Sequence, residues 1–392
     1  MKADKRIYLD HSASTPVREE VLSAMLPYWT TEYGNPSAVH RYGQAANQAL
    51  EDARRSVAQT LNAQPNEIIF TGCGSESDNL ALRGVMFAAR AAGRGNHLIT
   101  SIIEHKAVLD TALQLRDLFG FELTVLPVDK YGRVDPAQVE AAIRPDTALI
   151  SIMAANNEIG TIQPFERLGR IARANRVLFH TDAIQAAAVT DWDMDAMPVD
   201  LMSLAPHKFY GPKGVGILYI RQGVDLVPML TGGGQEGGRR AGTVNVPFAV
   251  GAAEALRLAA REREQTTAHY LGLSGRLIDG LLGALPEKCI LTGHPTQRLP
   301  HNASFAFRGI SGNDLLMHLD VAGISASSGS ACLTGDPKPS AVLQALGLGP
   351  EWTKGGLRLT VGRQNTVEDV EYALETIPSL VAQLERLNKE YA

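Results

Sequence analysis

The sequence predicts an α/β protein with a mainly parallel sheet and a smaller α+β domain toward the C-terminus. Between residues 67 and 221, short apolar runs alternate with segments of helical periodicity. This alternation is typical of strands joined by helices that cover both faces of a parallel sheet. The pattern changes at a long helical stretch over 248–285, and further strands and helices follow it. The chain of 392 residues is long enough for one large and one small domain.

Seven apolar runs are predicted to form the sheet of the large domain. They are Glu67–Thr71, Leu98–Ile103, Leu123–Val128, Ala148–Met153, Val177–His180, Leu201–Leu204 and Gly214–Arg221. The last run follows its predecessor closely, so we expect it to pair antiparallel at an edge of the sheet. Helices are predicted between several of the strands, at Asn79–Ala92, Lys106–Leu118, Pro136–Ile143 and Phe165–Ala174.

The C-terminal region is predicted to form the smaller domain. Its expected elements are strands at Ala303–Phe307, Ile324–Ala326 and Leu357–Val361, and helices at Gly312–Ala322 and Val367–Leu387. The long helical stretch Phe248–Leu285 is expected to break near Tyr270–Ser274. We predict a large domain over residues 15–261 and a small domain that combines residues 1–14 with 262–392.

Charge and cysteine usage argue against several function classes. The net charge of −5 gives no electrostatic basis for binding nucleic acid. The sequence contains no run of eighteen apolar residues, so it predicts no membrane-spanning helix. The residues after Met1 are charged and not apolar, so they predict no secretory signal. The three cysteines, Cys73, Cys289 and Cys332, are widely separated, which favours neither a disulfide framework nor a zinc site. These features favour a cytoplasmic protein with free thiols.

Cys332 is the most informative single residue. It follows Ser327–Ala331 in a run of small and turn-forming residues, where a core-filling thiol is not expected. A thiol on an exposed loop can act as a nucleophile and carry sulfur covalently. A chance cysteine in a turn is the alternative, and the local sequence does not decide between the two.

Four predicted strand ends carry polar groups, and ligands of open α/β sheets collect at such ends. The run Gly72–Asn79 leads into a helix whose free N–H groups favour a phosphate. Ser75 and Asp78 also fit an ordinary capping box. His105 follows the next strand and can stack on a ring or move protons, although a lone histidine is more often structural.

The two remaining strand ends carry Asp182 and Lys208. A buried carboxylate needs a partner, and the protonated ring nitrogen of a cofactor would supply one. A lysine at a strand end can form a Schiff base with an aldehyde. A phosphate cradle, a stacking ring, a carboxylate and a lysine are together what a pyridoxal phosphate site requires. By contrast, Gly232–Gly237 matches a dinucleotide fingerprint but opens no predicted helix, so we reject that interpretation.

These residues identify a family. The chain resembles the cysteine desulfurases of the nitrogen-fixation and iron–sulfur-cluster type, within the class V aminotransferase fold. The resemblance covers nearly the whole chain and rests on ordered motifs: Tyr8–His11, Gly34–Ser37, Glu76–Asn79, Glu104–Leu109, Asn156–Gly160, His180–Gln185, His207–Lys208, Gly211–Gly214, Arg240–Thr243 and Ser327–Cys332. It implies the fold of pyridoxal-phosphate-dependent transferases (fold type I), with a mainly parallel seven-stranded sheet.

The resemblance implies a set of cofactor-binding residues, which are Gly74, Ser75, His105, Asn156, Asp182, Gln185, His207, Lys208 and Thr243. Lys208 would hold the cofactor covalently, Asp182 would pair with its ring nitrogen, and His105 would stack on the ring and assist proton transfer. Gly74, Ser75 and His207 would bind the phosphate. Asn156 and Gln185 would contact the ring substituents. Thr243 would reach the phosphate from the partner subunit of a homodimer.

The resemblance also implies a substrate and a reaction. Asn35, Asn156 and Arg358 would bind L-cysteine, with the Arg358 guanidinium clamping its carboxylate. Cys332 would take the sulfur as a persulfide, leave L-alanine, and pass the sulfur to an iron–sulfur scaffold or another acceptor protein. No resident metal is expected, although Cys332 is a candidate transient iron–sulfur ligand. No contact with membranes or nucleic acid is implied.

Two alternatives stay open. One is a pyridoxal-phosphate-dependent C–S lyase acting on cystine or selenocysteine, for which Cys332 would be dispensable. The other is a non-catalytic sulfur-transfer scaffold, which Ala205 favours because the family often has serine there. Loss of that hydroxyl would cost about 1–3 kcal/mol of phosphate binding. Pro206 replaces a usual glycine, and Leu333–Lys338 departs from the usual loop sequence. The acceptor pathway therefore stays open between cluster assembly, nitrogenase supply and tRNA thiolation.

Overall fold

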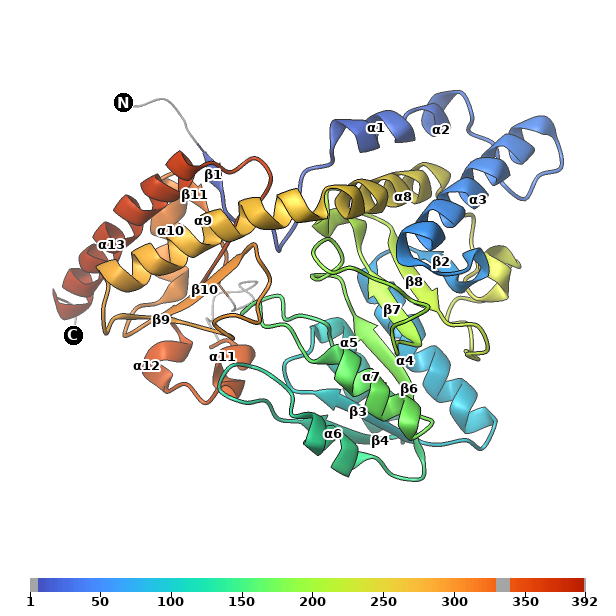
Figure 1. The fold of residues 1–392 in the computed structure, drawn as a ribbon, viewed down its shortest axis with the longest axis horizontal. Helices are drawn as coiled ribbons and strands as arrows, with labels where there is room; N and C mark the ends of the chain where they lie inside the picture. Colours follow the sequence, from blue (N-terminus) through green and yellow to red (C-terminus); the bar gives the residue numbers. More distant parts are fainter. Residues whose placement is uncertain (1–5, 329–338, 391–392) are drawn as a thin grey trace.

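The computed structural model describes residues 6–328 and 339–390. Two bodies lie side by side, one around a seven-stranded sheet and one around a three-stranded sheet, and the consecutive helices α8 and α9 extend from one to the other (Figure 1). Among the described residues, no helix is both long enough and apolar enough to cross a bilayer.

The predicted α/β fold with a mainly parallel seven-stranded sheet is confirmed. The strand order is β2-β8-β7-β6-β5-β3-β4, and the parallel pairs are those between β7, β6, β5, β3 and β4. The bounds are β2 Ile68–Thr71, β3 His97–Ser101, β4 Glu122–Leu126, β5 Thr147–Ser151, β6 Leu178–Asp182, β7 Leu201–Leu204 and β8 Gly216–Ile220. All seven predicted strands are therefore present.

Strand β8 is antiparallel, as expected, but the prediction that it forms an edge is wrong. It lies between β7 and β2 and pairs antiparallel with both, so β2 is the edge strand. All five residues of β8 are buried. A strand buried along its whole length is typical of a sheet interior, where neighbours satisfy both rows of its backbone hydrogen-bonding groups.

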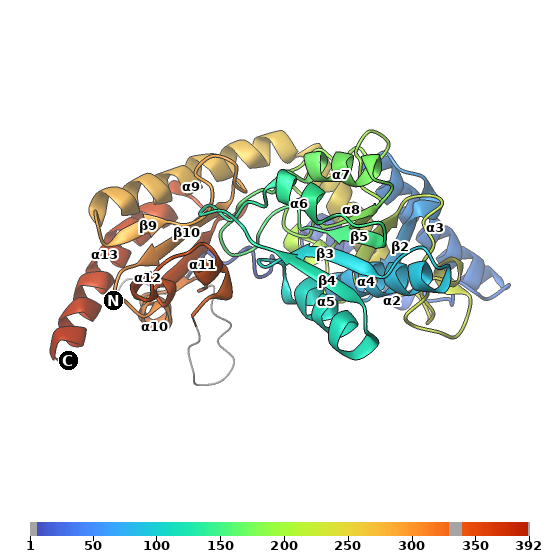
Figure 2. The same cartoon turned by 90° about the horizontal axis from the view of Figure 1, so that it is seen from below.

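Helices cover both faces of the large sheet (Figure 2). Along β2, Ile68 and Phe70 point into one hydrophobic core and Ile69 into the other, as the alternation of a strand requires. The first core is closed by α1 Glu19–Met25, α3 Arg41–Leu61, α6 Pro136–Ala142, α7 Phe165–Ala174 and α8 Val246–Arg261. The second is closed by α4 Gly74–Ala91 and α5 Lys106–Phe119.

The smaller body has its own hydrophobic core, which includes Leu277, Phe305 and Val370. Its antiparallel sheet has the order β12-β10-β9, and β1 pairs in parallel with β11, so the N-terminal strand lies in this body. The strands are β1 Ile7–Tyr8, β9 Cys289–Leu291, β10 Asn302–Phe307, β11 Ile324–Ser325 and β12 Gly356–Thr360. The helices are α9 Arg263–Ala284, α10 Gly312–Val321, α11 Ala341–Ala345, α12 Pro350–Thr353 and α13 Val367–Glu390.

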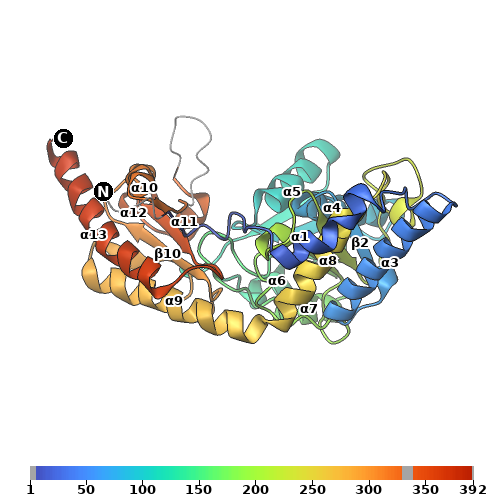
Figure 3. The ribbon, with the colours of Figure 1, turned by 90° about the horizontal axis from the view of Figure 1, so that it is seen from above.

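The break in the long helical stretch lies at Glu262 and not near Tyr270–Ser274, so the predicted position is wrong. Figure 3 shows the change of direction where α8 meets α9. Glu262 leaves helical geometry, with φ −103° and ψ 7°, and its carboxylate binds Arg18 and Arg363. The stretch from Tyr270 to Ser274 stays helical because its apolar side chains pack in the core and the Ser274 hydroxyl donates to the Pro300 carbonyl at 2.7 Å.

Candidate active site

A cavity of about 400 Å³ opens beyond the carboxyl ends of β6 and β7, where the loops after β2, β3 and β5 meet the segment that follows β1. It is lined by Ser12, Ala13, Cys73, Gly74, Ser75, His105, Met153, Ala155, Asn157, Asp182, Ile184, Gln185, Ala205, His207, Lys208 and Arg358. Eight of the residues singled out from the sequence therefore share one cavity: Gly74, Ser75, His105, Asp182, Gln185, His207, Lys208 and Arg358.

Lys208 lies in the short 3-10 helix η2, Pro206–Lys208, directly after β7. Its Nζ donates to the carbonyl oxygens of Ser12 and Ala13, both at 2.8 Å. Burial, reinforced by the nearby Arg358 charge, lowers the pKa of Lys208 to about 8. The amine is therefore held in place and has a substantial neutral fraction just above neutral pH, which a nucleophilic lysine requires.

Asp182 ends β6 and is 6% exposed. Its Oδ1 accepts a hydrogen bond from the Ile184 amide at 2.9 Å. Burial raises the pKa of Asp182, and the nearby His105 and Lys208 oppose this rise. A carboxylate in this setting gains most from a cation placed in the cavity, such as a protonated ring nitrogen.

The N-terminus of α4 reaches the cavity, but the predicted capping box is wrong. The N-cap is Cys73, whose Sγ accepts from the Glu76 amide at 3.4 Å. Asp78 is fully buried instead of capping the helix, which leaves Ser75 at the cavity wall. Cys73 is exposed and lines the cavity. A Cβ at Gly74 would lie 2.4 Å from Ile184 Cδ1 and 3.1 Å from Ala205 Cβ, so a larger residue there would force the Ile184 side chain to move.

Two histidines border the cavity in different ways. His105 caps α5, and its Nδ1 accepts from the Ala107 amide at 3.1 Å. In the neutral ring the proton then sits on Nε2, which is the nitrogen left for a ligand. Burial lowers the pKa of His207 to about 4, so it is neutral at pH 7 and can serve a phosphate only as a neutral donor.

Arg358 extends from β12 into the cavity wall. Its Nη2 binds Asp10 Oδ1 at 2.6 Å, and its Nη1 donates to the Asn157 carbonyl oxygen at 3.0 Å. Its Nε is buried and has no hydrogen-bond partner among residues 6–328 and 339–390. The guanidinium is thus oriented by two groups at the cavity wall, and its planar shape and fixed charge suit the binding of an incoming carboxylate.

Asn156 does not line the cavity, whereas its neighbour Asn157 does. The Asn156 amide is fully buried and used by the backbone: Nδ2 donates to Ile103 O at 2.9 Å, and Oδ1 accepts from the amides of Glu158 and Ile159. Asn156 is therefore placed as a structural residue of this turn. Because the two asparagines are adjacent and identical, the sequence does not indicate which of them lines the cavity.

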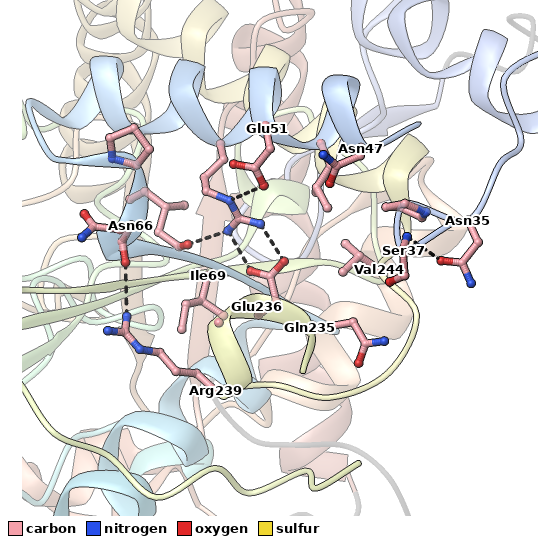
Figure 4. Close-up of a pocket in the computed structure, with 16 residues that line it drawn as sticks. Asn35, Ser37, Asn47, Glu51, Asn66, Ile69, Gln235, Glu236, Arg239 and Val244 are labelled. Atoms are coloured by element: carbon pink, nitrogen blue, oxygen red, sulfur yellow. Dashed lines mark hydrogen bonds and ion pairs between the residues drawn. The ribbon is translucent and has the colours of Figure 1, made fainter. Parts of the chain in front are cut away.

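Two other predicted residues, Asn35 and Thr243, do not line this cavity. Asn35 lines a second cavity of about 500 Å³ on another part of the large body, where its Oδ1 accepts from the Ser37 amide (Figure 4). Thr243 is exposed and lines neither cavity. Cys332 lies outside the described residues.

The second cavity also contains the glycine-rich run that was rejected as a dinucleotide fingerprint. Here Glu236, at φ 51°, accepts two hydrogen bonds from Arg54, each at 2.8 Å (Figure 4). Its Oε2 also accepts from the Phe70 amide at 2.8 Å. The run is therefore a turn that supports a buried ion pair, and no α-helix starts from it.

The Ser12 and Ala13 contributions could not be found from the sequence. Both residues bind Lys208 through carbonyl oxygens, and Ser12 also accepts from Gln185 Nε2 at 2.9 Å. Backbone carbonyls are present at every residue, so no side-chain motif marks them. The segment reaches the cavity because β1 is held by β11 in the smaller body.

Comparison with known proteins places this site in a family. The aminotransferase class-V family profile matches residues 7–373. The chain belongs to the cysteine desulfurases of the class-V aminotransferase family. It is 50% identical over 392 residues to the cysteine desulfurase IscS of Methanosarcina thermophila, covering 99% of this chain and 96% of the relative. It is 43% identical to cysteine desulfurase IscS 1 of Archaeoglobus fulgidus, covering 98% and 99%.

Solved structures show the same fold. A NifS-like protein superposes with a TM-score of 0.90 at 38% identity, covering 97% of this chain and 100% of that chain. A structure described as SspA in complex with cysteine superposes with a TM-score of 0.78 at 36% identity, covering 91% and 99%. The resemblance and the transferase fold predicted from the motifs are thereby confirmed.

Proposed function

We propose that the protein is a cysteine desulfurase that uses pyridoxal 5'-phosphate to convert L-cysteine into L-alanine and a persulfide on Cys332. The observation that carries the proposal is one cavity that holds a lysine of lowered pKa, a buried aspartate and an oriented arginine. Each group has the chemistry that this cofactor or an amino-acid substrate needs.

The cavity residues fit the cofactor. Lys208 would hold it covalently, Asp182 would face its ring nitrogen, and the N-terminus of α4 at Gly74 and Ser75 would receive its phosphate. Ala205 offers no hydroxyl there, and the neutral His207 ring supplies a neighbouring donor. When bound, pyridoxal phosphate serves as an electron sink for bonds at the substrate α-carbon.

The remaining side chains would bind the substrate and move protons. Arg358 would bind the carboxylate of cysteine with its planar guanidinium. Asn157, which lines the cavity, would take the ring-contacting role that the family resemblance implied for Asn156. His105 presents Nε2–H to the cavity and Lys208 supplies a second titratable nitrogen, so a proton can be delivered to the carbon that loses sulfur.

Cys332 is the proposed nucleophile of the sulfur transfer. Its thiolate attacks the substrate sulfur, the new S–S bond forms as the C–S bond breaks, and the bonding pair stays with the substrate carbon, which then takes a proton. Cys332 then carries the transferred sulfur as a persulfide. This sulfur can be passed to an acceptor protein, such as an iron–sulfur scaffold. Transfer to an acceptor protein and the cytoplasmic location are expectations, and which protein accepts the sulfur stays open.

A homodimer is part of the proposal. Exposed apolar side chains are concentrated between α1 and the first turn of α3, a stretch that includes α2 Pro27–Thr30: Leu22, Leu26, Trp29, Tyr33, Val39 and Tyr42. Such a concentration of exposed apolar side chains is typical of a protein interface. Thr243 lies outside the cavity of its own chain, and in such a dimer it could reach the phosphate in the cavity of the other subunit.

The test measures products from L-cysteine and a reductant with purified, cofactor-loaded protein. Alanine and sulfide are expected, and Cys332→Ala should abolish sulfide release. Cys289→Ala is the matched control, because Cys289 is buried and burial raises the pKa of its thiol to about 12, which makes it a poor nucleophile. Pyruvate in place of alanine, with Cys332 dispensable, would establish the C–S lyase.

Cofactor binding is tested separately by absorbance. A visible band should be present in wild type and absent in Lys208→Ala. A protein that binds no cofactor after incubation with pyridoxal phosphate would establish the non-catalytic scaffold.

A further inference from the structure

A buried polar network lies behind Asp182, on the face of the sheet that α4 covers. Its members are Asp78 on α4, Ser151 on β5, His180 on β6 and Ser203 on β7, and none of the four is exposed. In the register of β6 and β7, Asp182 pairs with Ser203. His180 and Asp182 are two residues apart on one strand, so they share this face.

His180 is the centre of the network and is neutral. Its Nδ1 lies 2.8 Å from Ser151 Oγ, and its Nε2 lies 3.1 Å from Ser203 Oγ and 3.7 Å from Asp78 Oδ1. Burial lowers the pKa of His180 to about 3. The ring therefore brings no positive charge to the carboxyl group beside it.

Asp78 is consequently a buried carboxyl group without a cation. Neither of its oxygens has a well-formed hydrogen bond within residues 6–328 and 339–390. Burial raises the pKa of Asp78 well above its ordinary value, the Asp182 charge adds to the rise, and the Ser203 hydroxyl opposes it weakly. A buried carboxylate in such surroundings takes up a proton because ionisation there costs more than protonation.

Asp182 is the better place for the negative charge of the pair. Burial raises the pKa of Asp182 as well, but the Ile184 amide, which donates to Asp182, and the nearby charges of His105 and Lys208 oppose that rise. Glu104 lies near both carboxyl groups, and burial raises its pKa to about 8, so it is neutral at pH 7. Two interacting carboxyl groups that share one proton leave the charge where it is best solvated.

We propose that Asp78 is a positioning residue for Asp182: Asp78 keeps the proton of this carboxyl pair, and the negative charge stays on Asp182 at the cavity wall. The consequence for the cofactor's ring nitrogen rests on the proposed function, whereas the position of the proton does not. An ionised Asp182 is what a protonated ring nitrogen requires, and Asp78 prevents the proton from settling there.

The test is infrared spectroscopy of the full-length protein, freed of cofactor, at pH 7. The C=O stretching band of a protonated carboxylic acid should weaken by one group in Asp78→Asn and should persist in Asp182→Asn. Asp110→Asn, on the exposed side of α5, is the matched control and should leave the band unchanged. Because the Asp182 charge also raises the pKa of Glu104, Glu104→Gln is introduced into every sample so that Glu104 contributes no band.

The reverse result would overturn the proposal. If Asp182→Asn loses the band and Asp78→Asn keeps it, the proton sits on Asp182. If neither variant changes the band, Asp78 is ionised. Asp78→Ser, which is smaller and also neutral, gives the same comparison if the asparagine variant does not fold. Because no substrate or cofactor is present, failure of the desulfurase proposal would not alter these outcomes.

Thermal unfolding supplies a second readout. A folded-state pKa above the unfolded value gives a stabilisation that is lost as pH rises through the folded-state pKa. The Tm of wild type should therefore fall more than the Tm of Asp78→Asn as the pH rises above about 4, where an aspartate of the unfolded chain ionises. An equal or larger fall in the variant would contradict a protonated Asp78.

Discussion

Asp10 and Arg358 form an ion pair, with 2.6 Å between Oδ1 and Nη2, at the wall of the cavity that holds Lys208. The pair joins the segment after β1 to β12 across the smaller body. Arg358 is the group proposed to bind the substrate carboxylate, so Asp10 occupies part of the surface that a substrate would use.

The ion pair predicts that Asp10→Asn lowers the KM for cysteine by about threefold. Asparagine can still accept a hydrogen bond from Arg358, but it carries no charge that competes with the substrate carboxylate. The size of the effect follows from the strength of such partly exposed pairs, which is up to ~1 kcal/mol. Steady-state kinetics that separate KM from kcat provide the measurement. Arg358→Lys should raise KM by about tenfold or more, because lysine lacks the planar fork. A raised KM in Asp10→Asn would mean that the Asp10 charge is needed to orient Arg358.

The different environments of Asn156 and Asn157 predict opposite phenotypes. Asn156→Ala removes the partner of a buried carbonyl and two buried amides, so unfolding stability should fall by about 2–4 kcal/mol. Asn157→Ala should leave stability nearly unchanged and shift the absorbance of bound cofactor. Denaturant unfolding and absorbance measured on both variants test this. A spectral shift confined to Asn156→Ala would restore the original assignment.

The lowered pKa of Lys208 predicts how cofactor loading depends on pH. The rate at which cofactor-free protein takes up pyridoxal phosphate should rise with pH and level off above about 8, as the amine loses its proton. Arg358→Gln should move the midpoint to higher pH, because Arg358 lowers the Lys208 pKa. A wild-type midpoint at about 10, near that of an ordinary lysine, would show that Lys208 is not desolvated.

Glu262 predicts a test of the junction between the two bodies. It binds Arg18, Arg261 and Arg363, and chiefly the Arg18 hydrogen bond lowers the pKa of Glu262 to about 2. Glu262→Gln should lower the free energy of unfolding at pH 7 by about 1–2 kcal/mol, since the site touches solvent. A depressed folded-state pKa stabilises above the unfolded value, so the difference from wild type should shrink as pH falls from about 4.5 toward about 2.

Glu254→Gln is the control for the Glu262 variant. Glu254 lies on the same helix, α8, and within residues 6–328 and 339–390 its ion pair is with Arg257, one turn away. Its loss should cost less than about 0.5 kcal/mol. Equal losses in the two variants would show that the junction contributes nothing beyond an ordinary surface pair.

Much of the fold was predictable because each element carries its own local signal. The seven strands are short apolar runs, and their positions were expected within a few residues. The place of β8 inside the sheet was not predictable, because strand order depends on which faces are covered and not on the strand itself. The helix break at Glu262 was missed because it depends on Arg18 and Arg363, which are distant in the sequence.

The sequence by itself determined which chemical groups the site contains. The family motifs, Lys208, Asp182 and Arg358 can be read directly from the sequence because the chemistry of a side chain depends only on its residue type. Only the tertiary structure decided which of two adjacent asparagines faces the cavity, that Cys73 lines it, and that Asp10 holds Arg358. It also placed Asp78 behind Asp182 without a cation, as burial and proximity arise from packing between α4, β6 and β7. Protonation follows from that packing, so no motif encodes it.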